Sequence, residues 1–439
     1  MMMPPLRRVV CLGCLLALHL REAKAFVPAL RAGSINSRRG VSPSRLREGA
    51  AGAPETRAPW QGTSQRPTQG RRPVSLSASQ GEGSAGPVLL QVDTDEGLGL
   101  TAAFWSEVAR AAETAETSHD VILLAPKVPA EAVQRLQESY AETRRDLGDL
   151  LPDIASVEVA VGAAPDSPDK LGFRITRVPG NSAPAAEAEG AGDAQAVATL
   201  RAWVERVVVG LKVCPFTHST DLSGTGLEGR GIMPGPVGYP VSRGTGAAAL
   251  LRDFWGESIG LIVSPPQQVS TLLLSAPYLA TGEGGFKQWV AFTDALTRSL
   301  RLFRADDLVK CIVFHPEYTR SQVVPQDGPV HCHLPPTSWL PKMMKSFYGA
   351  LEQEEKEGGS FPYEVSDFQR KAPLPVINVL RADVLEKAVV ESLVDLGGER
   401  RFTRVSGAKV YCANTYRLAG IGKQKLAEDL DQERRMVSP

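Results

Sequence analysis

Leu308-Val309-Lys310-Cys311-Ile312-Val313-Phe314-His315-Pro316 is an apolar, β-branched run that ends at a His-Pro step. Such residues favour an extended backbone, and a short apolar run that ends at a breaker is typical of a buried strand. Pro316 lacks a backbone N–H and holds His315 out of the helical region, so the strand should end there. The sequence therefore predicts that His315 lies at the margin of a sheet.

The composition indicates a soluble globular protein with an uneven distribution of charge. Of 439 residues, 43% are apolar and 22% are charged. Residues 1–80 contain 13 of the 49 Lys and Arg but 3 of the 49 Asp and Glu, so the remainder has a net charge of −10. Sequence-independent nucleic-acid binding needs a basic surface, and we therefore expect no nucleic-acid partner. The cysteines after the leader are too sparse for a disulfide framework; they are Cys214, Cys311, Cys332 and Cys412.

The N-terminus has the features of a two-part targeting leader. Residues 1–25 contain Arg7 and Arg8, a short apolar run and an Ala-Lys-Ala cleavage site, as a signal peptide does. Residues 26–86 start with Phe26, are first rich in Arg and Ser with few acids, and then rich in Gly, Pro and Gln. This arrangement resembles the signal-plus-transit leaders of algae with secondary plastids, followed by a disordered linker. We therefore expect a plastid location, with plain secretion as the alternative, and no membrane association after the leader is removed.

The rest of the chain predicts an α/β fold, with α+β as an alternative, in two small domains that contain βαβ units. In residues 87–180, strands alternate with helix-length segments, but no catalytic constellation is present, and the role of this domain is open. Residues 181–195 read as a linker. The second domain, 196–434, starts with a helix of period 3.6, and residues 375–396 are predicted to form another amphipathic helix.

Three stretches of the second domain, taken together, resemble the domain-of-unknown-function 1415 (DUF1415) family, over roughly residues 198–420. They are Trp203 with Val209-Gly210-Leu211-Lys212-Val213-Cys214-Pro215-Phe216, then Phe314-His315-Pro316-Glu317-Tyr318, then Ala372-Pro373-Leu374-Pro375-Val376-Ile377-Asn378-Val379-Leu380-Arg381, with a weaker match at Val410-Tyr411-Cys412-Ala413-Asn414. The chain departs from the family pattern at Ala372, where the family tends to have Ser, and at Asn378, where it tends to have His. No settled activity comes with this resemblance.

The candidate site combines residues of these stretches. His315 is a candidate acid/base and Cys214 a candidate nucleophile, although Cys214 follows a helix, whose negative end disfavours a thiolate, and a small buried thiol is the alternative. Substrate-binding candidates are Arg381, Asn378, Lys371, Arg370 and Tyr318. On the predicted helix, Asn378 and Arg381 are three residues apart and face one spot, where they would meet His315 over an anion. Arg381 could instead pair with Glu317 or Asp383.

Two further motifs give no assignment of a metal or phosphate site. His331-Cys332-His333 fits no zinc module by its spacing, so we assign no metal, and no cofactor can be named. Gly224-Thr225-Gly226-Leu227-Glu228-Gly229 lacks the strand and helix that make this pattern a phosphate site. The sequence thus favours a plastid enzyme for hydrolysis or group transfer on a small anionic metabolite. The alternative is a non-catalytic module that binds a metabolite or a protein partner.

Overall fold

The protein is described from a computed structural model, and its described residues all lie in one compact unit, Gln69–Pro439. They are 76–79, 88–92, 97–113, 120–124, 128–151, 154–161, 171–177, 191–214, 217–280, 282, 284–323, 339–347, 361–389, 393–395, 400–402 and 407–436. The predicted leader apart from Leu76–Ser79, most of the predicted linker and His331-Cys332-His333 lie outside these ranges. Leu76–Ser79 were predicted to be disordered, but they form strand β1, so that prediction is wrong for these four residues. Within them, no helix is long and apolar enough to cross a bilayer.

The fold is α/β, as predicted, and contains two five-stranded mixed sheets. The first has the order β1-β2-β3-β5-β4 and occupies residues 76–177, which we call the first half. Strands β2 and β3 are parallel and are joined by helix α2, whereas the other neighbours are antiparallel. The elements are β1 (Leu76–Ser79), β2 (Val88–Val92), α2 (Gly97–Glu113), β3 (Asp120–Leu124), α3 (Ala130–Asp146), η1 (Gly148–Leu150), β4 (Ile154–Val161) and β5 (Leu171–Arg177).

The second sheet has the order β6-β7-β8-β10-β9 and belongs to the second half, residues 191–436. Its elements up to β9 are α4 (Ala191–Trp203), the π-helix η2 (Val204–Gly210), β6 (Leu222–Ser223), η3 (Glu228–Arg230), β7 (Gly235–Gly238), α5 (Ala247–Val263), β8 (Thr271–Ser275), α6 (Gly285–Leu302), η4 (Ala305–Asp307) and β9 (Val309–Phe314). The remainder are α7 (Arg320–Val323), α8 (Trp339–Phe347), η5 (Tyr363–Gln369), β10 (Val376–Arg381), α10 (Ala382–Val389), β11 (Leu393–Asp395), β12 (Arg400–Phe402), α11 (Gly407–Ile421) and α12 (Lys423–Arg435). The predicted strand before His315 is confirmed as β9.

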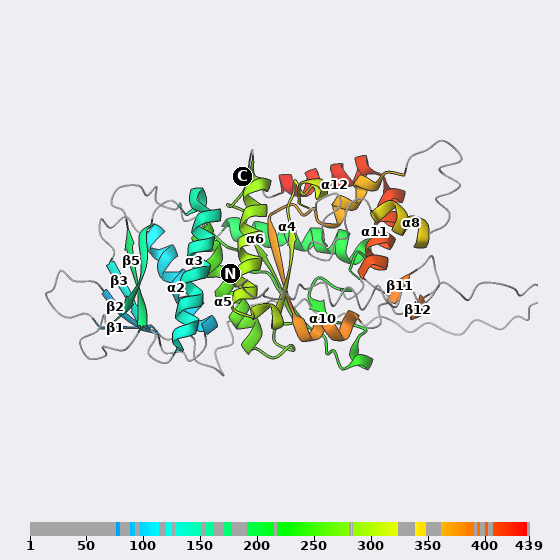
Figure 1. Cartoon of the computed structure of the whole chain (residues 1–439). Helices are drawn as coiled ribbons and strands as arrows, with labels where there is room; N and C mark the ends of the chain where they lie inside the picture. The colour runs from blue at the N-terminus through cyan, green and yellow to red at the C-terminus, as the bar shows by residue number, and fades with distance from the viewer. Residues whose placement is uncertain are drawn as a thin grey trace, which may run out of the picture. The chain divides into compact units, whose positions relative to one another are not determined.

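Helices cover both faces of the second sheet. Leu272 and Leu274 of β8 belong to the core that contains α5 and α6, whereas Leu273 between them packs with Leu200 and Trp203 of α4. In Figure 1, α2 and α3 lie beside the first sheet, and α5 and α6 beside the second. Helix α2 contacts α5, α3 contacts α6, and one hydrophobic core includes side chains of both pairs.

The predicted helix over residues 375–396 is wrong at its start. Val376–Arg381 form strand β10, which lies between β8 and β9 and is antiparallel to both, and only Ala382–Val389 are helical. A central strand that is covered on both faces is apolar at nearly every position, so its pattern does not separate it from a buried helix. This correction changes where the side chains of Asn378 and Arg381 lie.

Candidate functional site

The family-like stretches come together at one end of the second sheet. Val376 at the start of β10 pairs with Ser275 and Phe314, so β8 and β9 end where β10 begins. There the Trp203 indole N–H donates to the Lys371 carbonyl at 3.0 Å, and its ring lies 5.2 Å from the ring of Phe314. Asn414 of α11 donates to the Val213 carbonyl at 2.8 Å, one residue before Cys214. The predicted stretches therefore form one structural cluster, although they are distant in sequence.

His315 lies at the sheet margin, as predicted, but both of its ring nitrogens are occupied. Its side chain is buried against Phe286 and Trp289. Nδ1 accepts the backbone N–H of Glu317 at 3.1 Å, and Nε2 lies 3.1 Å from the carbonyl oxygen of Ala280, to which it donates. Burial lowers the His315 pKa from 6.5 to about 4 and outweighs the opposing bond to Ala280.

The position of Ala280 gives His315 a structural role. Ala280 has a φ of 57°, a left-handed conformation that costs energy for a residue other than glycine. Its carbonyl oxygen also packs against Gly285, where an added Cβ would lie 2.1 Å away. His315 therefore holds this strained turn at the start of α6 and has no free nitrogen for acid/base chemistry in this structure.

Arg381 and Asn378 do not meet His315. Val376 pairs with Phe314 and Arg381 with Val309, so His315 and Arg381 lie at opposite ends of a strand about 17 Å long. The Arg381 guanidinium donates to the carbonyls of Val269 and Ser264, and Asn378 Oδ1 accepts the Thr271 hydroxyl at 2.9 Å. The predicted shared site depended on a helix at 376–381 and is not formed. Both side chains instead fix the backbone around α5, β8 and β10.

Cys214 follows the carboxyl end of η2, as the sequence indicated, and is partly buried. Its Sγ accepts the Thr217 hydroxyl at 3.5 Å. A second thiol, Cys412 of α11, is fully buried, and burial raises its pKa to about 12. Cys412 is thus a protonated core thiol and not an activated nucleophile.

A buried polar group next to His315 is the most unusual part of this region. We call Arg320, Tyr318, Tyr411 and Asp367 the Arg320 cluster. Arg320 is only 3% exposed, its Nη1 donates to the Tyr411 hydroxyl, and its backbone N–H donates to Asp367 Oδ1 at 3.2 Å. Its Nε and Nη2 and the Tyr318 hydroxyl are buried without a hydrogen-bond partner among the residues that the structure describes.

Arg206 shows how Nε and Nη2 of a guanidinium together bind a carboxylate. Its Nε and Nη2 donate to Oε1 and Oε2 of Glu433, each at 2.7 Å, in a two-pronged ion pair. Arg381 uses the same two nitrogens on backbone carbonyls. In Arg320 these two nitrogens, which we call its fork, are buried and have no hydrogen-bond partner in the part of the chain that the structure describes. Two N–H groups in this arrangement match the oxygen pair of a carboxylate or phosphate.

The surroundings of the fork carry an excess of positive charge. Arg370 and Lys371 lie within electrostatic range of the cluster, and Lys423 and Arg434 lie within range of Lys371. The carboxylates within the same range are Asp367, Glu364 and Glu317, so cations outnumber them. Burial raises the Asp367 pKa although Arg320 and Lys371 act against it, and burial also lowers the Lys371 pKa. The predicted residues Arg370, Lys371 and Tyr318 thus lie close together. The buried arginine in this group is Arg320, whereas Arg381 was predicted.

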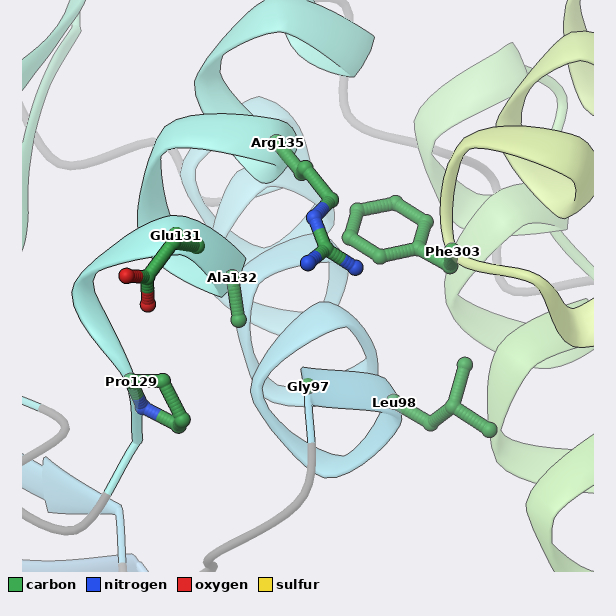
Figure 2. Close-up of a pocket in the computed structure, with 7 residues that line it drawn as sticks. All are labelled: Gly97, Leu98, Pro129, Glu131, Ala132, Arg135 and Phe303. Carbon is green, nitrogen blue, oxygen red and sulfur yellow. The ribbon is translucent and has the colours of Figure 1, made fainter.

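A pocket of about 270 Å³ lies elsewhere, at the starts of α2 and α3 (Figure 2). Arg135 extends there toward the ring of Phe303, and Leu98 adds an apolar wall. None of its lining residues was predicted as a site residue, and Arg135 and Glu131 are exposed. Among the described residues, no group of three or more His, Cys, Asp or Glu is arranged to hold a metal ion.

Arg320 and Asp367 were missed by sequence reasoning. Arg320 comes two residues after Tyr318, the last residue of a family-like stretch, and this proximity was the available signal. Its burial and the two unbonded nitrogens of its guanidinium are visible only in three dimensions, because an arginine side chain is usually solvated.

Comparison with known proteins gives one family and no individual relative. Residues 195–329 match the family described as "Protein of unknown function (DUF1415)". The match includes the stretches around Cys214 and His315 and ends before those at 372–381 and 410–414. No curated protein and no solved structure matches the chain.

Proposed function

We propose that the domain containing residues 195–329, which match the family described as "Protein of unknown function (DUF1415)", is a non-catalytic module that binds a small anionic metabolite at Arg320. The observation that carries this proposal is that the buried Nε and Nη2 of Arg320, and the buried hydroxyl of Tyr318 in the same cluster, bond to none of the described residues. A buried donor without an acceptor costs about 1–3 kcal/mol, and a bound carboxylate or phosphate would offset that cost. The free protein would thus be arranged for an anion before the anion binds.

The same contacts argue against the enzyme that the sequence favoured. Hydrolysis or group transfer would need a base or nucleophile close to the anion. His315 donates from one ring nitrogen and accepts at the other, and Cys412 is a protonated thiol. We therefore favour the binding alternative over catalysis.

The chemistry around the fork defines the class of ligand. The parallel N–H groups at Nε and Nη2 match two oxygens of one carboxylate or phosphate, and the Tyr318 hydroxyl can donate to the same group. Arg370 and Lys371 add positive charge nearby and favour a second anionic group on the ligand. We thus expect dicarboxylates or phosphorylated acids of low mass to bind better than a single halide ion.

A thermal-shift and calorimetric screen of the purified chain tests this proposal. Inorganic phosphate, succinate and a phosphorylated carboxylic acid should raise Tm, whereas chloride at equal ionic strength should not. Tyr318→Phe should weaken binding by about tenfold, because a charge-assisted hydrogen bond contributes roughly 1.5–3 kcal/mol. Arg320→Lys should weaken it further, since lysine cannot present a fork.

Two variants control for charge and for the loss of a tyrosine hydroxyl. Lys287→Gln removes an exposed lysine of α6, and Tyr416→Phe removes the hydroxyl of a tyrosine that is 46% exposed on α11. Neither should change the affinity. The proposal fails if no anion stabilises the protein, or if Tyr318→Phe and Arg320→Lys bind anions as well as the unaltered chain does.

We also propose that the protein works in a plastid, on the strength of its signal-like and transit-like N-terminal segments. Residues 1–86 fused to a fluorescent protein should enter the plastid of an alga with a secondary plastid. Fluorescence in the medium would instead favour secretion.

A further inference from the structure

The two sheets have the same strand order and the same directions. In the first, an antiparallel edge pair β1–β2 is followed by the parallel pair β2–β3, and β5 lies antiparallel between β3 and β4. In the second, β6–β7 is antiparallel, β7–β8 is parallel, and β10 lies antiparallel between β8 and β9. The connecting helices also correspond, with α2 equivalent to α5 and α3 to α6.

The lengths and positions of these elements agree as well. Helices α2 and α5 each have 17 residues, and α3 and α6 have 17 and 18. From α2 to β4, each element begins at a nearly constant separation along the chain from its counterpart. The starts are Gly97 and Ala247, Asp120 and Thr271, Ala130 and Gly285, and Ile154 and Val309.

A sequence signature marks the equivalent helices. Phe104-Trp105 and Phe254-Trp255 occupy the same two positions of α2 and α5, and each pair is followed two residues later by glutamate. Their rings meet edge to face in both helices, with centroids 5.3 and 5.4 Å apart at 81° and 80°. Both indole nitrogens are buried without a hydrogen-bond partner among the described residues. Such agreement in position, geometry and burial is unlike a chance similarity of topology.

Equivalent helices also pack against each other. Helix α2 contacts α5, and α3 contacts α6. At the second contact, the Ser139 hydroxyl donates to that of Ser299 at 3.0 Å, and Arg298 pairs with Asp146. Contact of each element with its own counterpart is the arrangement found in a two-fold symmetric dimer.

We propose that the first half is a diverged duplicate of the core of the second half. It packs on the second half in the place that a second copy of that domain would take in a dimer, and so serves as a built-in partner. Helix α5 is buried around most of its circumference, with Ala248, Leu251, Phe254 and Trp255 all below 6% exposure. Removal of the first half would expose an apolar surface of the kind that marks subunit interfaces. The first half thus completes the fold of the second, independently of any ligand at Arg320.

Hydrogen exchange on the full chain, measured by mass spectrometry, tests this assignment. A core mutation in either half should raise exchange in the other half. Phe104→Ala should raise exchange in α5 and α6 by about tenfold or more, because loss of a buried phenylalanine destabilises every element in the same cooperative core. Phe254→Ala should raise exchange in α2 and α3 to a similar degree. Leu426→Ala, a buried change in α12 outside the shared core, should leave α2 and α3 protected.

Exchange confined to the mutated half for either phenylalanine variant would overturn the proposal, since an appended, independent domain would respond in that way. Should those variants not fold, Ser139→Ala and Ser299→Ala give the same test with smaller changes. Either serine variant should raise hydrogen exchange in both α3 and α6. An increase restricted to one of these helices would count against the built-in partner.

Discussion

The two halves share a core topology but differ in what covers the outer face of the sheet. In β5, Arg174 is exposed between buried Phe173 and Ile175, as in a strand with one solvated face. In the equivalent strand β10, Val376, Ile377 and Val379 are all buried, because α4 covers the second face. The Arg320 cluster and the family-like stretches occur only in the half with this extra layer. The shared core is thus a scaffold, and the candidate site comes with the additions to it.

The largest expected effect comes from removing the side chain that joins the extra layer to the sheet. Trp203 is 1% exposed, packs on Phe314 and donates to the Lys371 carbonyl. Trp203→Ala should lower the free energy of unfolding by about 3–5 kcal/mol, as measured in urea, because it leaves a cavity and an unpaired carbonyl. A loss below about 1 kcal/mol would mean that the second sheet does not depend on the α4 layer, which has no counterpart among the described elements of the first half.

The contrast between the halves also explains what the sequence could predict. Strand β9 and His315 at its end were predicted because an apolar run and a proline are local signals. Strand β10 was mistaken for a helix because burial on both faces removes the alternation that identifies a strand. The Phe-Trp-x-Glu repeat at 104–107 and 254–257 was present in the sequence, but its meaning depends on the topology around it.

The site was harder to predict than the fold. His315, Lys371, Arg370 and Tyr318 do lie together, and their nearness in the family-like stretches was a usable signal. The choice of Arg381 over Arg320 failed because it rested on helical spacing. Which arginine lacks a partner depends on long-range contacts, such as that between Arg381 and Val269, and no local pattern contains them.

A smaller effect should appear in the dependence of stability on pH. The folded-state pKa of His315 is about 4, below its ordinary value of 6.5. The unfolded chain therefore binds more protons between these values, so stability is full above pH 6.5 and falls as the pH drops toward 4. Between pH 6.5 and 5 the loss from this residue should be about 2 kcal/mol. Urea unfolding of His315→Gln should lack this component, and an identical pH profile for both proteins would contradict the anchoring role.

The smallest effect is expected at the residue that matters most for the proposed function. Arg206→Met should cost about 1.5–3 kcal/mol in urea unfolding, because it breaks the two-pronged pair with Glu433 and leaves that carboxylate largely buried. Arg320→Met in anion-free buffer should cost less than about 1 kcal/mol, since removing two buried donors without acceptors offsets the lost bond to Tyr411. The unaltered chain should gain stability when phosphate is added, and Arg320→Met should not. A loss as large as that of Arg206→Met, without phosphate, would mean that Nε and Nη2 of Arg320 already have acceptors and that this fork is not kept for a ligand.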